Sequence, residues 1–226
     1  APIRFLLGDA PREISAIDPT MTVLAYLRGV EGLRGTKEGC AEGDCGACTV
    51  VLAEPCGDRL RYRAVNSCIQ FVPSLHGRQL LAVEHLADAA GRPHSCQQLL
   101  AESHGSQCGF CTPGFVMSLF ALCHGEARPD REGIADALAG NLCRCTGYGP
   151  IIEAAMRLAA APAADRFTAQ AAQTLNALRS LRGTGAVALA GAGTRYFAPR
   201  SADDLAALLL AEPQATLLAG GTDVGL

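Results

Sequence analysis

The sequence contains almost no lysine. Lys37 is the only one, and the other basic residues are arginines spread along the chain without a Lys/Arg-rich run. With 19 basic and 22 acidic residues, the formal net charge is −3. Binding to nucleic acid or to an anionic membrane depends on clustered positive charge. We therefore expect neither a nucleic acid nor a membrane as the main partner.

Long apolar runs and an export signal are also lacking. No stretch approaches the roughly 20 consecutive apolar residues of a membrane-spanning helix. Residues Ala1–Phe5 have neither the basic start nor the apolar run of a signal peptide. Hydrophobic residues make up 49% of the chain and charged residues 18%, which favours a buried core over disorder. We expect a folded, soluble protein of the cytoplasm.

Cysteine is present in unusual number. In a small secreted chain, 11 cysteines would form a disulfide framework. Here the export signal is lacking and the number of cysteines is odd. In a reducing compartment, cysteines at this density are more often metal ligands. Their spacing then indicates which of them belong together.

The first group of cysteines lies in a glycine-rich loop and has the pattern Cys-x4-Cys-x2-Cys, with one more cysteine downstream. Its members are Cys40, Cys45, Cys48 and Cys68. This is the spacing of a plant-type [2Fe–2S] ligand set. Glycines such as Gly43 and Gly46 let the backbone wrap closely and direct N–H groups toward an anionic cluster. Zinc is the alternative, but zinc sites usually use paired Cys-x2–4-Cys knuckles, and Cys68 has no close partner in sequence.

The second group combines a Cys-x2-Cys pair with a Cys-x-Cys pair. Its members are Cys108, Cys111, Cys143 and Cys145. Each pair precedes a helix that opens at a proline, Pro113 or Pro150, so helix dipoles would stabilise negative charge there. A Cys2His2 finger is excluded because His124 lacks a second histidine nearby, and a thioredoxin-like pair would need a βαβ context. The spacing favours a second iron–sulfur cluster and leaves a four-cysteine zinc site open.

Three cysteines and the histidines lie outside these groups. Cys96 and Cys123 are expected on apolar helix faces and Cys56 in a loop. The five histidines are residues 76, 85, 94, 104 and 124, and they show no ligand pairing, so we expect surface or helix positions. No Ser/His/Asp arrangement and no Walker loop is found. The chain is expected to carry electrons and to contain no catalytic residue.

The predicted elements change in type along the chain. A small mixed sheet with one helix is predicted from strands at 3–7, 12–17, 49–53, 61–65 and 80–84 and a helix at 22–28. A helical bundle is predicted from helices at 94–104, 112–125, 130–140 and 150–159. Beyond a linker that is helical around Leu175–Leu181, we predict a helix over Ala202–Leu210 and a strand over Ala215–Leu218. This last segment is too short to bury a core, so we expect a third domain that is only begun.

Three cysteine-containing segments resemble those of a known enzyme family. They read GCAEGDCGACT from Gly39, QCGFCTPG from Gln107 and NLCRCTGY from Asn141. These segments are similar to the iron–sulfur segments of the molybdenum hydroxylases, which include xanthine dehydrogenase, aldehyde oxidoreductases and carbon monoxide dehydrogenase. The resemblance covers about residues 1–161 and includes all eight candidate ligands. It implies a [2Fe–2S] cluster on each cysteine group.

The resemblance also implies the fold class α+β. A β-grasp, plant-type ferredoxin-like domain over 1–85 would precede an all-α four-helix [2Fe–2S] domain over 86–161. A linker over 162–186 would lead into the start of an α/β FAD-binding domain over 187–226. In this family the helical-domain cluster lies nearest the molybdenum cofactor, so Gln107 and Cys145 would approach the molybdopterin of a partner chain.

The end of the sequence resembles the first FAD-binding loop of the family's flavin domain. The residues of this candidate loop are Leu217, Leu218, Ala219, Gly220, Gly221, Thr222, Asp223 and Val224. Gly220 and Gly221 would let the backbone approach a pyrophosphate and offer N–H donors. Because only one loop of the site is present, we expect these 226 residues alone to bind FAD poorly.

Members of this family differ in whether the iron–sulfur chain continues beyond the helical domain into a flavin-like segment, as this sequence does. This continuation is typical of the iron–sulfur/FAD small subunit of bacterial xanthine dehydrogenase, whose molybdenum-binding large subunit completes an (αβ)2 heterotetramer. The resemblance implies that electrons released by oxidation of xanthine to urate pass through both clusters to FAD and then to NAD+. Two alternatives stay open: a molybdenum hydroxylase acting on an aldehyde or another N-heterocycle, and a stand-alone ferredoxin-type electron carrier.

Overall fold

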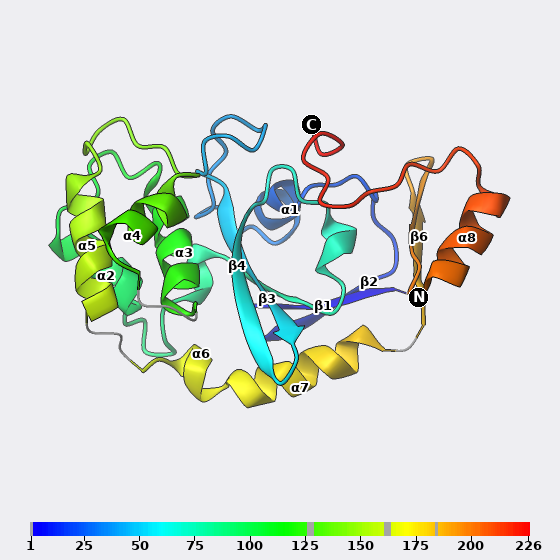
Figure 1. The fold of residues 1–226 in the computed structure, drawn as a ribbon, viewed down its shortest axis with the longest axis horizontal. Helices are drawn as coiled ribbons and strands as arrows, with labels where there is room; N and C mark the ends of the chain where they lie inside the picture. The colour runs from blue at the N-terminus through cyan, green and yellow to red at the C-terminus, as the bar shows by residue number, and fades with distance from the viewer. Residues whose placement is uncertain (1, 126–128, 161–163, 184) are drawn as a thin grey trace.

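The computed structural model describes residues 2–125, 129–160, 164–183 and 185–226. A sheet occupies the middle of an elongated molecule, with helices α2 to α5 at one end and a hairpin with α8 at the other (Figure 1). Both α and β structure are present, as the sequence predicts. Within the described residues, no helix is both long and apolar enough to cross a membrane.

The N-terminal part contains a five-stranded sheet with the spatial order β2-β1-β5-β3-β4. The strands are β1 (Ile3–Leu7), β2 (Ala10–Ile14), β3 (Thr49–Cys56), β4 (Arg59–Asn66) and β5 (Gln79–Leu81). β1 runs parallel to β5, and the other neighbouring pairs are antiparallel. The alternating side chains of Ile3, Phe5 and Leu7 are buried in one core with Val23 of α1 (Val23–Ala25). All five predicted strands are therefore present, although β2 lies earlier in the chain and β5 is shorter than expected.

Helix α1 opens the segment that carries the first cysteine group. The Thr22 hydroxyl accepts a hydrogen bond from the Ala25 N–H at 3.1 Å and caps the helix start. The chain then widens into a π-helical turn, Tyr26–Val30, and leaves regular structure until β3. The irregular stretch between that turn and β3 contains Cys40, Cys45 and Cys48, whereas Cys68 follows β4.

The helical part comprises α2 (Ser95–Glu102), α3 (Thr112–Cys123), α4 (Arg131–Leu138) and α5 (Gly149–Ala160). Helices at all four predicted places are confirmed, and Pro113 stands in the first turn of α3 as expected. α3 is buried from Gly114 to Phe120 because it lies between the other helices and the sheet. Phe115 and Phe120 share a core with Val51 of β3. The sheet and the helices are thus packed together directly.

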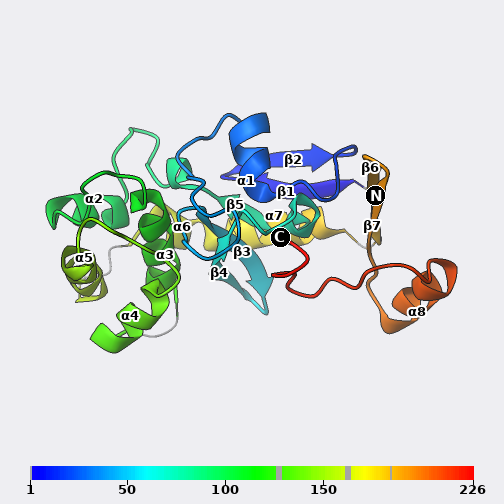
Figure 2. The ribbon, with the colours of Figure 1, turned by 90° about the horizontal axis from the view of Figure 1, so that it is seen from above.

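The predicted linker is more ordered than its weak periodicity indicates. It forms α6 (Arg166–Ala169) and α7 (Ala171–Arg182), which includes the predicted helical stretch. α7 runs along the sheet in both views (Figures 1 and 2) and buries Leu175 and Leu178. The Arg166 guanidinium lies 2.6 Å from the Asp9 carboxylate, which joins α6 to the turn between β1 and β2.

The C-terminal segment forms a hairpin and a helix. The hairpin consists of β6 (Val187–Gly191) and β7 (Thr194–Ala198), and the helix is α8 (Ala202–Ala211). α8 confirms the predicted helix. The predicted strand at Ala215–Leu218 is wrong, because these exposed residues pair with no strand in the described structure. Gly220 and Gly221 of the candidate FAD-binding loop have positive φ angles of 89° and 85°, a conformation that favours glycine.

Candidate functional site

The four cysteines of the first group come together beside α1. Cys40 and Cys45 approach each other across their loop, and Cys48 approaches Cys68. The Cys40 N–H donates to the Cys45 Sγ, and the Cys45 N–H donates to the Cys40 Sγ, both at 3.4 Å. Cys48 and Cys68 are buried with Leu24. The spacing-based grouping therefore corresponds to a compact set of four sulfurs.

Backbone N–H groups give the first group its electrostatic character. Burial acts to raise the pKa of the Cys40 thiol, but the N–H groups of Glu42 and Cys45 outweigh it and lower this pKa to about 7. At the other pair, burial and the nearby Cys48 sulfur raise the pKa of Cys68 to about 12. The loop thus provides donors where it wraps around Cys40, as expected for a site that holds an anionic group.

Glycines allow the loop to wrap this closely. A Cβ on Gly39 would lie 2.8 Å from the Cys45 Sγ. Gly43 has a φ of +87°, and a Cβ there would lie 2.8 Å from the Ile69 side chain. Both positions therefore need glycine for a physical reason that the sequence analysis anticipated.

The second group is assembled from two loops of the helical part. Cys108 contacts Cys145, and Cys111 contacts Cys143, so each sulfur pair joins one cysteine from each loop. Cys111 occupies the position just before α3, whose N-terminus therefore points at this group. Burial raises the pKa of Cys111 to about 12, and the neighbouring Cys143 sulfur adds to this effect.

A threonine and a tyrosine hold the loop of Cys143. The Thr146 hydroxyl lies 3.2 Å from the Cys143 Sγ, and the Thr146 N–H donates to the same sulfur at 3.5 Å. The Cys143 N–H donates to the Tyr148 hydroxyl at 2.9 Å. Burial raises the pKa of the Cys143 thiol, but the hydrogen bonds from Thr146 outweigh this effect and lower it. These contacts provide the second group with donors to sulfur.

The pairing of the sulfurs distinguishes between metal types. In a [2Fe–2S] cluster each iron takes two thiolates, whereas zinc needs four ligands around one point. Both cysteine groups are arranged as two pairs. In the part of the chain that the structure describes, no three Cys, His, Asp or Glu side chains converge on the position of one metal ion. The two pairs of thiolates in each group therefore fit a [2Fe–2S] cluster.

The two groups differ in their surroundings. Cys108 and Cys145 are exposed, and the neighbouring side chains of Gln107, Phe110 and Leu142 are exposed as well. Beside the first group, the loop predicted to bind FAD lies against the segment that follows Cys68. A small pocket there is lined by residues of both segments and of β7, which are Ile69, Gln70, Phe71, Ser74, Tyr196, Leu218, Gly220 and Gly221.

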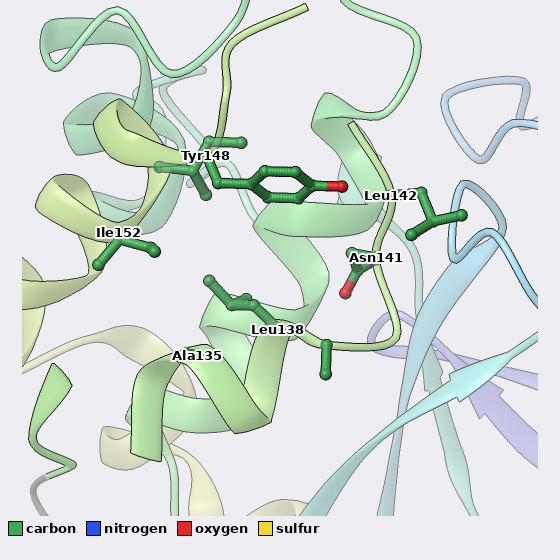
Figure 3. A pocket seen from close by; sticks show the side chains of 8 residues that line it. Ala135, Leu138, Asn141, Leu142, Tyr148 and Ile152 are labelled. Atoms are coloured by element: carbon green, nitrogen blue, oxygen red, sulfur yellow. The ribbon is translucent and has the colours of Figure 1, made fainter. Parts of the chain in front are cut away.

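An apolar cavity of about 260 Å³ lies between α4 and α5 (Figure 3). Its lining includes Leu138, Asn141, Leu142, Tyr148 and Ile152. Asn141 and Leu142 belong to the segment that leads from α4 to Cys143, and Figure 3 places them on the side toward the sheet. This segment connects the two cysteine groups, since the Leu142 N–H donates to the Cys45 carbonyl oxygen at 3.0 Å.

A buried charged cluster was missed by the sequence analysis. The Asp165 carboxylate accepts hydrogen bonds from His94 at 2.8 Å and from His124 at 2.9 Å. Burial opposes ionisation, but these imidazoles and the Thr168 N–H hold the pKa of Asp165 far below its usual range. His94 and His124 stand at the ends of α2 and α3, which agrees with the expected helix positions, but their burial and their pairing with Asp165 were not expected. No sequence signal links them to Asp165, which is distant in the chain.

Comparisons with known proteins agree with this geometry. Residues 6–73 match a family described as "2Fe-2S iron-sulfur cluster binding domain", and residues 82–156 match a family described as "[2Fe-2S] binding domain". The chain is 48% identical over 155 residues to xanthine dehydrogenase from Emericella nidulans, covering 68% of this chain and 11% of that protein. It is 49% identical over 139 residues to aldehyde oxidase 2 from Cavia porcellus, covering 61% of this chain and 10% of that protein. The chain thus spans about a tenth of the length of these curated relatives.

A solved structure matches most of the chain. Quinoline 2-oxidoreductase from Pseudomonas putida 86 aligns with a TM-score of 0.60 and 30% identity. The alignment covers 80% of this chain and 96% of that one. Similarity in sequence, in fold and in the paired cysteine groups all point to one family of oxidoreductases. The chain therefore belongs to the molybdenum hydroxylase family, of which it is the [2Fe–2S] electron-transfer portion.

Proposed function

We propose that the chain relays electrons in a xanthine dehydrogenase, with one [2Fe–2S] cluster on each cysteine group. The ligands would be Cys40, Cys45, Cys48 and Cys68 for the first cluster and Cys108, Cys111, Cys143 and Cys145 for the second. The observation that carries this proposal is the arrangement of both groups as two sulfur pairs. When bound, such clusters supply one-electron redox chemistry. The chain itself contributes the ligands, the hydrogen bonds to sulfur and the relative placement of the sites.

The exposure of the second group and the place of the candidate FAD loop support a direction for the relay. The exposed second group, with Gln107 and Cys145, would face the molybdopterin of a large partner subunit. The segment that follows Cys68 lines a pocket together with Gly220 and Gly221, so FAD bound by this loop would lie on the side of the first group. Electrons would pass one at a time from the second group to the first and on to FAD, which would reduce NAD+.

We propose xanthine as the substrate of the whole enzyme. Xanthine, water and NAD+ would give urate, NADH and a proton, so that two electrons cross this chain in each turnover. Similarity to an aldehyde oxidase and a quinoline oxidoreductase favours, as a second candidate, an enzyme acting on an aldehyde or another N-heterocycle. Assays of the complete complex on purines, aldehydes and quinoline, with NAD+ as acceptor, separate the two.

The domain architecture is part of the proposal. The sheet order, with parallel β1 and β5 at its centre, supports a β-grasp domain over 1–85. A four-helix domain over 86–161, a linker over 162–186 and the start of a flavin domain over 187–226 would follow. The boundary at 161–162 lies outside the described residues. We further propose an (αβ)2 heterotetramer with the large subunit.

Chemical analysis of the purified chain tests the cluster proposal. We expect about four iron and four acid-labile sulfide per chain, a brownish-red colour and two EPR signals after reduction. A colourless protein with stoichiometric zinc would overturn it. Isolation as a molybdenum-free monomer that still exchanges electrons would instead favour a stand-alone electron carrier.

A further inference from the structure

We propose that Asn141 is a positioning residue that holds the two cysteine loops at a fixed separation for electron transfer between them. This inference rests on the proposed function, since it concerns the step in which the reduced second cluster passes one electron to the oxidised first cluster. In this step an Fe(II) of the second cluster becomes Fe(III), and an Fe(III) of the first becomes Fe(II). No bond or proton has to move, so the step depends on the distance and the connection between the two sites.

The Asn141 side chain is buried at the junction of three segments. Its Nδ2 donates to the Gly46 carbonyl oxygen at 3.0 Å and to the Thr49 Oγ1 at 3.1 Å. Its Oδ1 accepts a hydrogen bond from the Ser118 hydroxyl at 2.6 Å. Both amide N–H groups and the carbonyl oxygen are thereby used. Since the side chain is only 4% exposed, water does not readily replace these partners.

The partners of Asn141 stand next to candidate ligands on both sides. Gly46 follows Cys45 directly, and Thr49 follows Cys48. Asn141 itself lies two residues before Cys143. A single amide therefore ties the loop of the first group to the loop of the second group, and Ser118 ties both to the middle of α3.

Two glycines permit this close approach. A Cβ on Gly46 would lie 2.2 Å from the Gly140 carbonyl oxygen, and a Cβ on Gly114 would lie 2.2 Å from the Gly46 carbonyl oxygen. The backbones of the first cysteine loop, the start of α3 and the segment after α4 therefore meet without side chains between them. Only this spacing lets the Asn141 amide reach its partners.

Leu142, the residue after Asn141, provides a hydrogen bond between the two cysteine loops. The Leu142 N–H donates to the Cys45 carbonyl oxygen at 3.0 Å, so one hydrogen bond joins a residue adjacent to Cys143 with a ligand of the first group. Leu142 is 55% exposed and follows the buried Asn141 directly. Its position therefore depends on Asn141, whose side chain is anchored on all polar atoms.

The test is EPR spectroscopy of the Asn141→Ala variant of the full chain, with both clusters bound and in complex with the large subunit. With both clusters reduced, their unpaired spins interact magnetically, and the splitting of the EPR signals falls steeply as the separation increases. We expect both signals to remain, the splitting to weaken or vanish, and electron equilibration between the clusters to slow. Gly140→Ala and Asn176→Ala are matched controls, since nothing lies near a Cβ on Gly140 and Asn176 is exposed on α7. Both should keep the wild-type splitting.

A second variant decides the case if Asn141→Ala fails to assemble. Ser118→Ala removes only the donor to the Asn141 Oδ1 and touches no candidate ligand, so we expect both signals with a reduced splitting. If Asn141→Ala assembles with both clusters and shows the wild-type EPR splitting, the positioning role is overturned. If Asn141→Ala does not assemble, the wild-type splitting in Ser118→Ala overturns it. Failure of the proposed function is distinguishable, because the wild-type chain would then lack one or both EPR signals.

Discussion

The two cysteine groups share a pairing of sulfurs but differ in burial and in how they are built. In the first group Cys48 and Cys68 are only 1% and 5% exposed, and three of the four cysteines come from one short loop. In the second group Cys108 and Cys145 are exposed, and the cysteines come from two loops that the helices bring together. The first group therefore depends mainly on local backbone conformation, and the second depends on the packing of the bundle.

This difference has consequences for the redox chemistry. Solvent exposure and hydrogen bonds to sulfur both influence the potential of an iron–sulfur cluster. The first group has N–H donors at Cys40, whereas the second has the Thr146 hydroxyl and N–H at Cys143. Covering the exposed second group with a partner would change its surroundings far more than those of the first. Substitutions that act on only one cysteine group can therefore test whether the two groups differ in this way.

The largest effect is expected from removing one ligand of one group. Cys45→Ser should abolish one of the two EPR signals of the reduced protein and leave the other, because the other group keeps its four thiolates. Cys108→Ser should give the reciprocal result. Low-temperature EPR with iron and sulfide analysis measures both variants. Loss of both signals, or of neither, in Cys45→Ser would contradict the grouping of the cysteines.

A smaller effect is expected from loosening the bundle that assembles the second group. Asp165→Asn removes the charge shared by His94 at the start of α2 and His124 at the end of α3. The substitution replaces a buried carboxylate, which accepts hydrogen bonds from both rings, by an amide that lacks its negative charge. We expect a loss of roughly 2–4 kcal/mol in the free energy of unfolding. Asp58→Asn, which breaks an exposed ion pair with Arg179, is the control and should change little.

The same carboxylate makes this contribution dependent on pH. The pKa of Asp165 is lowered on folding from an ordinary value of 3.8. Its contribution is therefore present in full above about pH 4 and is lost as the pH falls further. Thermal unfolding of the wild type and of Asp165→Asn at neutral and acidic pH measures this, and their midpoints should converge on the acidic side. An equal difference at both pH values would show that the charge of Asp165 is not responsible.

The smallest effect is expected at one hydrogen bond to sulfur. Thr146→Val removes the hydroxyl that lies 3.2 Å from the Cys143 Sγ. A donor to sulfur stabilises the more negative, reduced cluster, so its loss should lower the potential of the second cluster. A change of tens of millivolts corresponds to roughly 1 kcal/mol for one electron. In a redox titration followed by EPR, the first cluster of the same molecule is the reference and should not shift.

The chemistry and most helices could be predicted because their signals are local. Cysteine spacing, the glycines between ligands and Pro113 at the start of α3 all act within a few residues. The strand predicted at Ala215–Leu218 did not form because an apolar run needs a neighbouring strand, and within the described residues β6 pairs with β7 instead. α7 was only partly predicted, since burial of Leu175 and Leu178 against the sheet stabilises it.

Spacing along the chain was sufficient to group the cysteines, because cysteines only a few residues apart share a loop and form the recognisable triplet or pairs of each group. The placement of the two groups relative to each other was decided by tertiary packing. Asn141 meets Gly46, and Asp165 meets His94 and His124, across many intervening residues. Such contacts leave no periodicity or spacing in the sequence, because they arise only once the sheet, the helices and α6 are folded together.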